Sequence, residues 1–373
     1  MRIASFNVEN LFARPKAMNL ATWKEGAPVL AAHAELNSLL QCADYHEPGV
    51  AERILALFEE LGLLHDDEGP YVRLRKIRGR ILKRPKQGPV TVAASGRADW
   101  IGWVELKTER VDELAMKHTA MVICDVDADV MGVVEAESRP TLALFTEAML
   151  SQVGGRPYEQ VMVVDGNDQR GIDVGLLARC EYPLLEIRSH IFDTDAKGVV
   201  FSRDCCEYHL RLPDGTRLVV LVNHLKSKGY SAPDDRIGAK RRTRQATRIA
   251  SIYRALREEG HRHIAVLGDL NDDPSSEALK PLLDGSGLRD ISDHPDFDWG
   301  GRKGTFGSGN EKDKIDYVLL SPELYGKATG GAVFRKGIWR GPRTKNPWPI
   351  YETLTADVHA ASDHAAIYAE IAL

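Results

Sequence analysis

The stretch that most limits how this chain can fold is residues 264–274, where an apolar run ends in acidic and amide side chains. The run 264–267 predicts a buried strand that stops at Gly268. Asp269 and Asn271 are two positions apart, so their side chains point the same way if the chain stays extended. A carboxylate beside an amide suits a hard divalent ion and a phosphoryl group, although a plain polar turn would use the same residue types.

Polar side chains also stand at the ends of other predicted strands. These residues are Asn7 near the end of the strand 2–8, Glu135 after 130–134, His224 after 218–222, Asp316 at the start of 316–320, and Asp363 and His364 before 365–373. Asp173 lies inside the apolar run 172–177, where a lone carboxylate needs a buried partner such as a histidine. A carboxylate at the tip of a buried strand is costly unless it is solvated, paired or bound to metal, so these positions are candidate site residues.

The length of the chain, 373 residues, exceeds the usual size of one domain. We expect one domain over 1–373 that contains an inserted subdomain at 14–114, made of a helix over 51–64 and a small basic β unit. No run of about 18 apolar residues and no signal-peptide pattern is found, so we expect no membrane span and a cytoplasmic protein. Five cysteines without CxxC spacing predict reduced, mostly buried thiols.

A basic strip, residues 73–86, contrasts with the net charge of −5. It holds eight basic side chains and no acidic one, which leaves 41 basic residues to set against 54 acidic ones elsewhere. The strip is either an exposed edge whose charges discourage aggregation or a surface that follows a phosphate backbone. Near the predicted strand ends, Arg170, Lys226 and Lys228 are further candidates for holding a substrate phosphate.

The ordered set of polar strand ends resembles the endonuclease/exonuclease/phosphatase superfamily, whose fold is that of deoxyribonuclease I. The motifs that carry the resemblance are Gly-Asp-Leu-Asn at 268–271 and Ser-Asp-His at 362–364, together with Asn7, Glu135 and Asp316 in the same order. The resemblance implies a four-layer α/β/β/α sandwich of two mixed sheets with the site at one mouth. The chain departs from the family in a long insertion after the first strand, since Asn7 and Glu135 are 128 positions apart, and in Glu9, where many nuclease members carry Asp.

The resemblance also implies roles for the site residues, with Mg²⁺ or Mn²⁺ as the cofactor. The metal site would be led by Glu135, supported by Asn7, and completed by Asp269, Asn271 and Asp363. His364 would contact the scissile phosphate or move a proton, with Asp316 holding its ring. The remaining catalytic candidates are Asp269, Asn271 and His224, and Asp173 is placed beside His224 from its position alone.

We expect a divalent-metal-dependent phosphoester hydrolase, and the basic strip favours a nuclease, endo or exo, that cleaves DNA or RNA. The alternative is a phosphatase or phosphodiesterase for a small-molecule or lipid phosphoester, which the acidic net charge fits. A more remote alternative is a non-catalytic binding protein on the same fold. Against it stands the set of candidate catalytic positions, since none of them is replaced by a residue unable to do the chemistry.

Overall fold

The computed structural model describes residues 1–9, 11–18, 20, 23–168, 171–228, 235, 237–341 and 348–373. The chain divides into two compact units. Unit 1 comprises Met1–Phe12, Val111–Lys228 and Gly238–Leu373, and unit 2 comprises Ala13–Arg110 and Gly229–Ile237. The predicted inserted subdomain, 14–114, did not include the second of these segments of unit 2.

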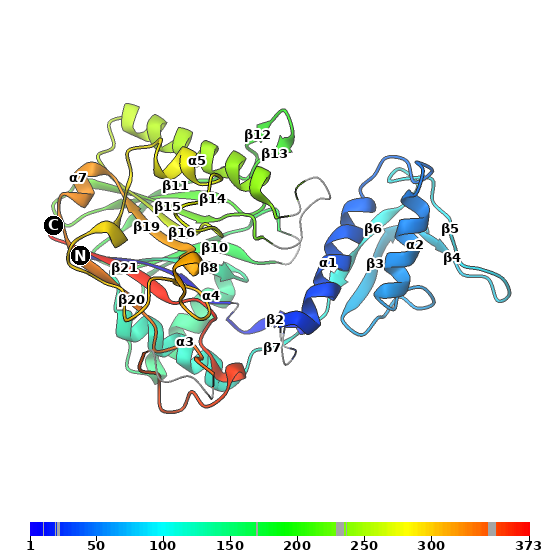
Figure 1. The fold of residues 1–373 in the computed structure, drawn as a ribbon, viewed down its shortest axis with the longest axis horizontal. Coiled ribbons are helices and arrows are strands. Elements are labelled where there is room, and N and C mark those ends of the chain that lie inside the picture. Colours follow the sequence, from blue (N-terminus) through cyan, green and yellow to red (C-terminus); the bar gives the residue numbers. More distant parts are fainter. Residues whose placement is uncertain are drawn as a thin grey trace. The chain divides into compact units, whose positions relative to one another are not determined.

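Two mixed sheets form the centre of unit 1 (Figure 1). Within the described residues, the first sheet has the strand order β18-β20-β21-β1-β8-β10-β9. Its strands are β1 (Arg2–Asn7), β8 (Val130–Ala136), β9 (Gln160–Val164), β10 (Asp173–Ala178), β18 (Phe297–Asp298), β20 (Ala328–Phe334) and β21 (Ala366–Ile371). Strands β1 and β8 are parallel, while β21 and β10 flank them in the antiparallel sense.

The second sheet has the order β11-β14-β15-β16-β19-β17 over the same described ranges. Its strands are β11 (Leu184–Arg188), β14 (Cys205–Arg211), β15 (Arg217–His224), β16 (His263–Asp269), β17 (Arg289–Asp290) and β19 (Asp316–Leu320). Strands β15 and β16 are parallel, and β19 runs antiparallel to β16. A further hairpin pairs β12 (Thr194–Asp195) with β13 (Gly198–Val199).

The main core of unit 1 lies between the two sheets. Along β8, Val130 and Val134 face this inner core while Met131 and Val133 face the opposite side. This alternation explains why the strand is apolar along its whole length, because both of its faces are covered. Gly132 allows the close approach of the sheets, since a Cβ there would lie 3.1 Å from the Leu267 side chain.

Helices cover the outer face of each sheet, which completes four layers (Figure 1). The first sheet is covered by α3 (Glu113–Val126) and α4 (Arg139–Phe145), and a π-helical turn (Thr146–Leu150) continues α4. The second is covered by α5 (Ala239–Glu258), and the short α6 (Lys280–Leu283) and α7 (Pro322–Tyr325) follow β16 and β19 along the chain. Three-residue 3₁₀ turns occur at Ile291–Asp293, Glu311–Asp313 and Asp357–His359. The predicted α/β/β/α architecture is confirmed.

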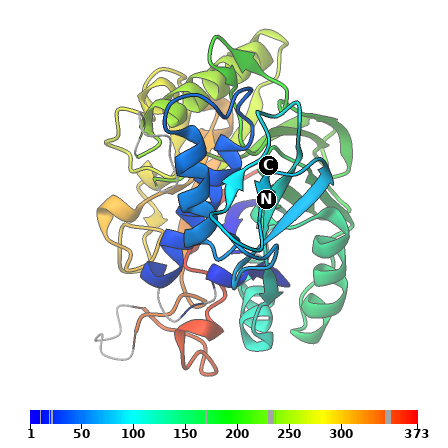
Figure 2. The same ribbon diagram turned by 90° about the vertical axis from the view of Figure 1, so that its right-hand side faces the viewer.

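Unit 2 has its own core and its own small sheets. Its two longer helices, α1 (Trp23–Leu39) and α2 (Val50–Glu60), contact each other (blue in Figure 1 and Figure 2). The strand pairs are β3 (Val72–Arg78) with β6 (Ile101–Leu106), β4 (Leu82–Lys83) with β5 (Thr91–Val92), and β2 (Ala13–Pro15) with β7 (Thr108–Arg110), and a 3₁₀ turn spans Lys16–Met18. Buried Trp100, Phe58 and Leu36 belong to the core of this unit.

Two local predictions differ from the structure. The sequence after the strand 264–267 predicts a helix near 275–283, but only Lys280–Leu283 is helical. The preceding serines form local hydrogen bonds instead, from Ser275 N–H to Asp273 Oδ1 and from Ser276 Oγ to Asp272 Oδ2, which compete with a helical turn. The extended conformation also ends at Asp269, since Asn271 adopts a left-handed φ of 56°.

The structure bears on two compositional expectations as well. All five cysteines are free thiols; Cys205 and Cys206 are buried, Cys42 and Cys124 are half-buried, and Cys180 is exposed. Among the helices of the described segments, none combines the length and the apolar character that crossing a bilayer requires.

Candidate active site

Strand pairing brings the predicted polar strand ends to one edge of the sheets in unit 1. In the first sheet Asn7 pairs with Val134, so the last residues of β1 and β8 lie side by side. In the second sheet His224 pairs with Asp269, which in turn pairs with Asp316. The inner faces of the sheets are packed together, and the polar side chains meet where this packing ends.

Glu135 occupies a bulge in β8. The register with β10 pairs Val134 with Val174 and Ala136 with Asp173, so it passes over Glu135. The backbone of Glu135 has a left-handed φ of 66°, which is uncommon for a residue with a side chain. Bulges and strained backbone of this kind occur next to active sites, where they redirect a side chain. The bulge turns Glu135 toward His224, whose Nε2 lies 3.7 Å from Glu135 Oε1.

The Gly-Asp-Leu-Asn motif is held by a close backbone approach at Gly268 and by hydrogen bonds to the Asp269 carboxylate. Gly268 has a φ of 135°, and a Cβ at this position would lie 1.9 Å from the carbonyl oxygen of Asn223. Only glycine therefore allows β15 and β16 to approach here. Beyond it, Asn271 donates its backbone N–H to Asp269 Oδ1 at 2.7 Å and its side-chain amide to Asp269 Oδ2 at 3.1 Å. The two side chains meet through this turn and not through continued extension.

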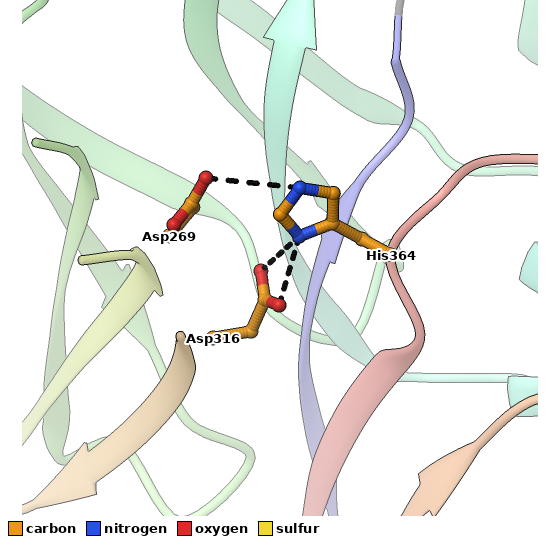
Figure 3. A group of neighbouring side chains, drawn as sticks. All are labelled: Asp269, Asp316 and His364. Carbon is orange, nitrogen blue, oxygen red and sulfur yellow. Dashed lines mark hydrogen bonds and ion pairs between the residues drawn. The ribbon is translucent and has the colours of Figure 1, made fainter. Parts of the chain in front are cut away.

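His364 lies between two carboxylates (Figure 3). Its Nδ1 is 3.1 and 2.9 Å from the two oxygens of Asp316, and its Nε2 is 3.9 Å from Asp269 Oδ2. Asn7 also faces this group, because its Nδ2 lies 3.4 Å from both Asp269 Oδ2 and His364 Nε2. The Oδ1 atom of Asn7 accepts the backbone N–H of Glu9.

The loop before β21 is fixed to both sheets. Ser362 Oγ donates to the carbonyl of Asn7 at 2.7 Å and accepts the backbone N–H of His364 at 2.9 Å. Thr305 Oγ1 accepts the backbone N–H of Asp316 at 3.0 Å, and Phe306 packs its ring 4.9 Å from the imidazole of His364. These contacts explain why Ser362 belongs to the Ser-Asp-His motif: it places the histidine relative to β1.

Burial and neighbouring charges shift the protonation of this group. Burial lowers the pKa of the His364 imidazole, but the carboxylates of Asp316, Asp363 and Asp269 outweigh it and raise that pKa well above its usual value. Burial raises the pKa of Asp269, an effect partly offset by His364. Both shifts follow from carboxylates crowded into a buried space, where a bound cation would relieve their repulsion.

The donor atoms of this group suit a hard divalent cation, because most of them are oxygens and not histidine nitrogens. Asp269, Asp316 and His364 offer ligand atoms within 4.8 Å of one another. The nitrogen of His364 that faces Asp316 is engaged by that carboxylate, so we interpret this trio as a positioned histidine. Oxygen donors suitable for Mg²⁺ or Mn²⁺ remain on Asn7, Glu135 and Asp269, and His224 Nε2 lies within 3.7 Å of both carboxylates.

The remaining predicted residues lie around this centre to different degrees. Asp363 is next to the imidazole, with Oδ1 3.7 Å from His364 Nε2, and its backbone N–H donates to Glu9 Oε2. Asp173 is buried at the start of β10 and accepts the backbone N–H of Gly166 at 2.7 Å. Burial raises the pKa of Asp173 to about 7. Its role beside His224 stays a prediction.

The candidate phosphate-binding residues have protein partners of their own. Lys228 Nζ is 2.8 Å from Asp272 Oδ1, and the Lys226 backbone N–H donates to Gln245 Oε1. Arg170 lies outside the described residues. Asp272 was missed by the sequence reasoning, although it directly follows the Gly-Asp-Leu-Asn motif. It also pairs with Arg242 in the first turn of α5, where a cation without such a partner would oppose the helix dipole.

These features define a class of protein: a two-sheet α/β/β/α sandwich with a carboxylate and histidine cluster at one edge. A sequence profile described as the Endonuclease/Exonuclease/phosphatase family matches residues 91–296, more than half of the chain. The chain therefore belongs to this family of phosphoester hydrolases, which confirms the resemblance. No curated protein sequence matches it.

Solved structures resemble this chain at low sequence identity. The mannosyl-6-phosphatase of Bacteroides thetaiotaomicron superposes with a TM-score of 0.53 at 17% identity, covering 70% of this chain and 92% of that one. Truncated TDP2 of Caenorhabditis elegans gives 0.46 at 17% identity, with 69% and 90% covered. The human Nocturnin catalytic domain, solved with bound sulfate, gives 0.46 at 14% identity, with 71% and 88% covered. The first of these supports the fold, and at this identity it supports the fold alone.

Proposed function

We propose that the protein is a divalent-metal-dependent nuclease that hydrolyses phosphodiester bonds in DNA or RNA. The observation that carries the hydrolytic part is the meeting of Asp316, His364 and Asp269 with the bulged Glu135 and with Asn7 and His224. The choice of nucleic acid as substrate rests on the basic strip at 73–86, whose eight cations match a polyanion.

The cation would be Mg²⁺ or Mn²⁺, held by Glu135 and Asp269 with Asn7 in support, and with Asn271 and Asp363 close enough to complete the site. Such an ion supplies charge neutralisation at the phosphoryl oxygens and lowers the pKa of a bound water. Mg²⁺ commonly takes only one or two protein carboxylates and keeps several waters, so this small set of oxygens is sufficient.

The chain's own residues would position the phosphate and move the proton. Asp316 accepts the Nδ1 hydrogen of His364, which fixes the ring and leaves Nε2 toward Asp269. Nε2 is then placed to hold a proton for a phosphate oxygen or for the leaving oxygen. His224 Nε2, 3.6 Å from Asp269 Oδ2, is placed to do the same from the second sheet. General acid–base groups of this kind contribute about 10²- to 10⁴-fold in rate.

A phosphatase or phosphodiesterase for a small or lipid phosphoester is the second candidate. Three cations of the basic strip already face acidic side chains: Arg73 with Glu68, Arg75 with Glu105, and Arg84 with Asp67. Together with the net charge of −5, these pairs reduce the attraction for a polyanion. The sugar phosphate named for the Bacteroides protein makes such compounds a sensible part of a substrate test.

A substrate panel tests the proposal. The full chain would be incubated with single- and double-stranded DNA, RNA, a sugar phosphate, sphingomyelin and bis(4-nitrophenyl) phosphate, each with Mg²⁺, Mn²⁺ or chelator. Glu135→Ala serves as the blank, and Glu277→Ala, which alters an exposed carboxylate paired with Lys280, serves as the matched control.

We expect nucleic acid to be cleaved only with metal, equally by the wild type and Glu277→Ala, and not by Glu135→Ala. If the sugar phosphate or the lipid is hydrolysed and the nucleic acid is not cleaved, the second candidate function is supported in place of the nuclease. No difference between Glu135→Ala and the wild type on any substrate would support the non-catalytic alternative.

A further inference from the structure

The β3–β6 pair of unit 2 has one covered face and one open face. Val72 pairs with Leu106 and Leu74 with Val104, and these residues belong to or pack against the core of unit 2. Because side chains alternate along a strand, the intervening pairs point the other way. These are Arg73 with Glu105 and Arg75 with Trp103. The open face is therefore built from cations, one carboxylate and one indole.

Two exposed apolar side chains of unit 2 lie on this strand pair. Trp103 is 38% exposed, and Ile77, at the bulge two residues beyond Arg75, is 70% exposed. Within the described residues of segment 13–110 of unit 2, these two are the exposed large hydrophobic residues, while Ile237 of the other segment of unit 2 is 60% exposed. Exposed apolar surface of this kind commonly marks an interaction site.

Exposed cations follow Arg75 along the chain. Lys76, Arg78, Arg80, Lys83 and Lys86 are all exposed. Where the chain is described, none of these five takes part in an ion pair, whereas Arg73, Arg75 and Arg84 each face an acid. The unpaired charge thus runs from the end of β3 through the turn into the β4–β5 hairpin. An aromatic residue with a line of cations beside it is the arrangement that binds stacked bases and their phosphates.

We propose that the open face of the β3–β6 pair and the adjoining end of β3 bind single-stranded nucleic acid, with a base stacked on Trp103 on the open face and phosphates held by the exposed Lys76, Arg78 and Arg80 at that end. Arg75, directly opposite Trp103 on the neighbouring strand, borders the stacked base. This inference rests on the proposed function for its choice of ligand, but binding at unit 2 is a separate event from hydrolysis. It assigns the inserted segment a role in substrate capture.

Single strands fit this face better than the other anionic partners. A duplex hides the flat faces of its bases, so it could use the cations but not Trp103. An anionic membrane would need a broader apolar surface than Ile77 and Trp103 provide, and Glu105 lies within the same face. A splayed strand uses both features, since stacking is indifferent to base identity and the phosphates follow the cations.

Fluorescence anisotropy with the full chain tests the inference. The probe is a labelled oligothymidylate of about 12 nucleotides, within the roughly 4 to 16 that such platforms cover, in chelator so that no cleavage occurs. Trp103→Ala should weaken binding about 5- to 150-fold, the range for one lost stacking contact. Lys76→Ala/Arg78→Ala/Arg80→Ala should weaken it further at low salt and reduce the steepness of its salt dependence.

Matched controls separate this face from general effects. Phe192→Ala removes an aromatic side chain of unit 1 that is 86% exposed, and Lys327→Ala removes an exposed lysine beside Ala372. Both should bind the probe as the wild type does. Circular dichroism and hydrolysis of bis(4-nitrophenyl) phosphate should be unchanged in Trp103→Ala.

The outcomes distinguish the proposed binding face from the proposed nuclease activity. If Trp103→Ala and the triple variant bind as tightly as the wild type, the proposed face is wrong, even if nucleic acid is cleaved. Stronger binding to duplex DNA or to anionic phosphatidylserine vesicles, insensitive to Trp103, would also overturn it. If the probe binds through Trp103 but no nucleic acid is hydrolysed, the face stands and the nuclease proposal fails.

Discussion

Asp316 engages Nδ1 of His364 with both carboxylate oxygens, at 3.1 and 2.9 Å, although the two residues are 48 positions apart. The contact depends on Ser362, which ties the histidine to β1, and on Thr305, which holds the backbone of Asp316. The ring of His364 is thus oriented by groups from both sheets, and Nε2 is the nitrogen left toward the remaining site residues.

Replacing Asp316 by Asn should lower kcat about 10²- to 10⁴-fold with little change in KM, because the ring would lose its fixed orientation. Steady-state hydrolysis of a chromogenic diester measures this effect. The ¹⁵N shifts of His364 report the same loss through the Nδ1 tautomer, which a purely structural role would not move. Asp357→Asn, an exposed control, should match the wild type. An unaltered tautomer would contradict the positioning role.

The bulge at Glu135 predicts a separation of stability from activity. Glu135→Gly should leave the free energy of unfolding within about 1 kcal/mol of the wild type, because relief of the left-handed φ offsets the added flexibility of glycine. Its hydrolytic rate should fall at least about 100-fold. Urea denaturation and initial rates measure the two quantities. Val134→Gly, one residue earlier in the buried strand, should instead be clearly destabilised, and equal losses in the two variants would refute the strained bulge.

Gly268 offers the converse case, a residue required by the backbone. Gly268→Ala should cost at least about 3 kcal/mol, since its Cβ would lie 1.9 Å from the carbonyl oxygen of Asn223. Gly215→Ala is the matched control, because its φ is also positive, 86°, but no atom lies within 4 Å of the added Cβ. That control should lose only about 1–2 kcal/mol. Similar melting temperatures for the two variants would show that β15 and β16 can separate.

The sequence predicted the strand ends better than it predicted how they meet. Asn7, Glu135, His224, Asp269 and His364 follow or precede apolar runs, so their positions at strand ends could be inferred from hydrophobic patterning. The left-handed turn at Asn271 could not, because a single φ value leaves no periodic signal. Nor could the pairing of Asp272 with Lys228 and Arg242, which depends on where α5 and β16 pack.

Only one of the two longer helices of unit 2 could be predicted from the sequence. The helix expected over 51–64 corresponds to α2, Val50–Glu60, because its apolar residues recur at helical spacing. The longer α1, Trp23–Leu39, was not predicted, since Pro28 and several alanines obscure its periodicity. Asn37 fixes this helix to β6: its Nδ2 donates to the carbonyl of Val104, and its Oδ1 accepts the backbone N–H of Val104. Tertiary contacts of this kind are not visible in the pattern of a single helix.

The ion pair between His190, which follows β11, and the buried Glu207 of β14 predicts a pH dependence of stability. Burial alone would raise the pKa of Glu207, but hydrogen bonds from His190 and His209 lower it to about 2. Burial lowers the pKa of His190, but Glu207 and Asp193 outweigh this and raise it above its usual 6.5. The contribution of Glu207 to the free energy of unfolding is fully present at pH values above its usual pKa of 4.5 and is lost as the pH falls toward 2. The contribution of His190 to the free energy of unfolding is fully present below pH 6.5 and is lost as the pH rises through the raised pKa of this residue.

The stability difference between the wild type and Glu207→Gln should therefore be greatest between about pH 4.5 and 6.5 and should shrink on either side. Urea unfolding at a series of pH values measures it, and the NMR titration of His190 should show a lower pKa in the variant. A difference that stays constant from acid to neutral pH would mean that the pair does not titrate as a unit.

The central claim is that strand ends from both sheets form one cation site, and Mn²⁺ binding tests it most directly. Isothermal titration of the full chain with Mn²⁺ would be compared with that of Glu135→Gln from the first sheet and Asp269→Asn from the second, with Glu277→Gln as the exposed control. The account predicts that Glu135→Gln and Asp269→Asn each lose the binding seen in the wild type and in Glu277→Gln. Unchanged Mn²⁺ affinity in both site variants would contradict it.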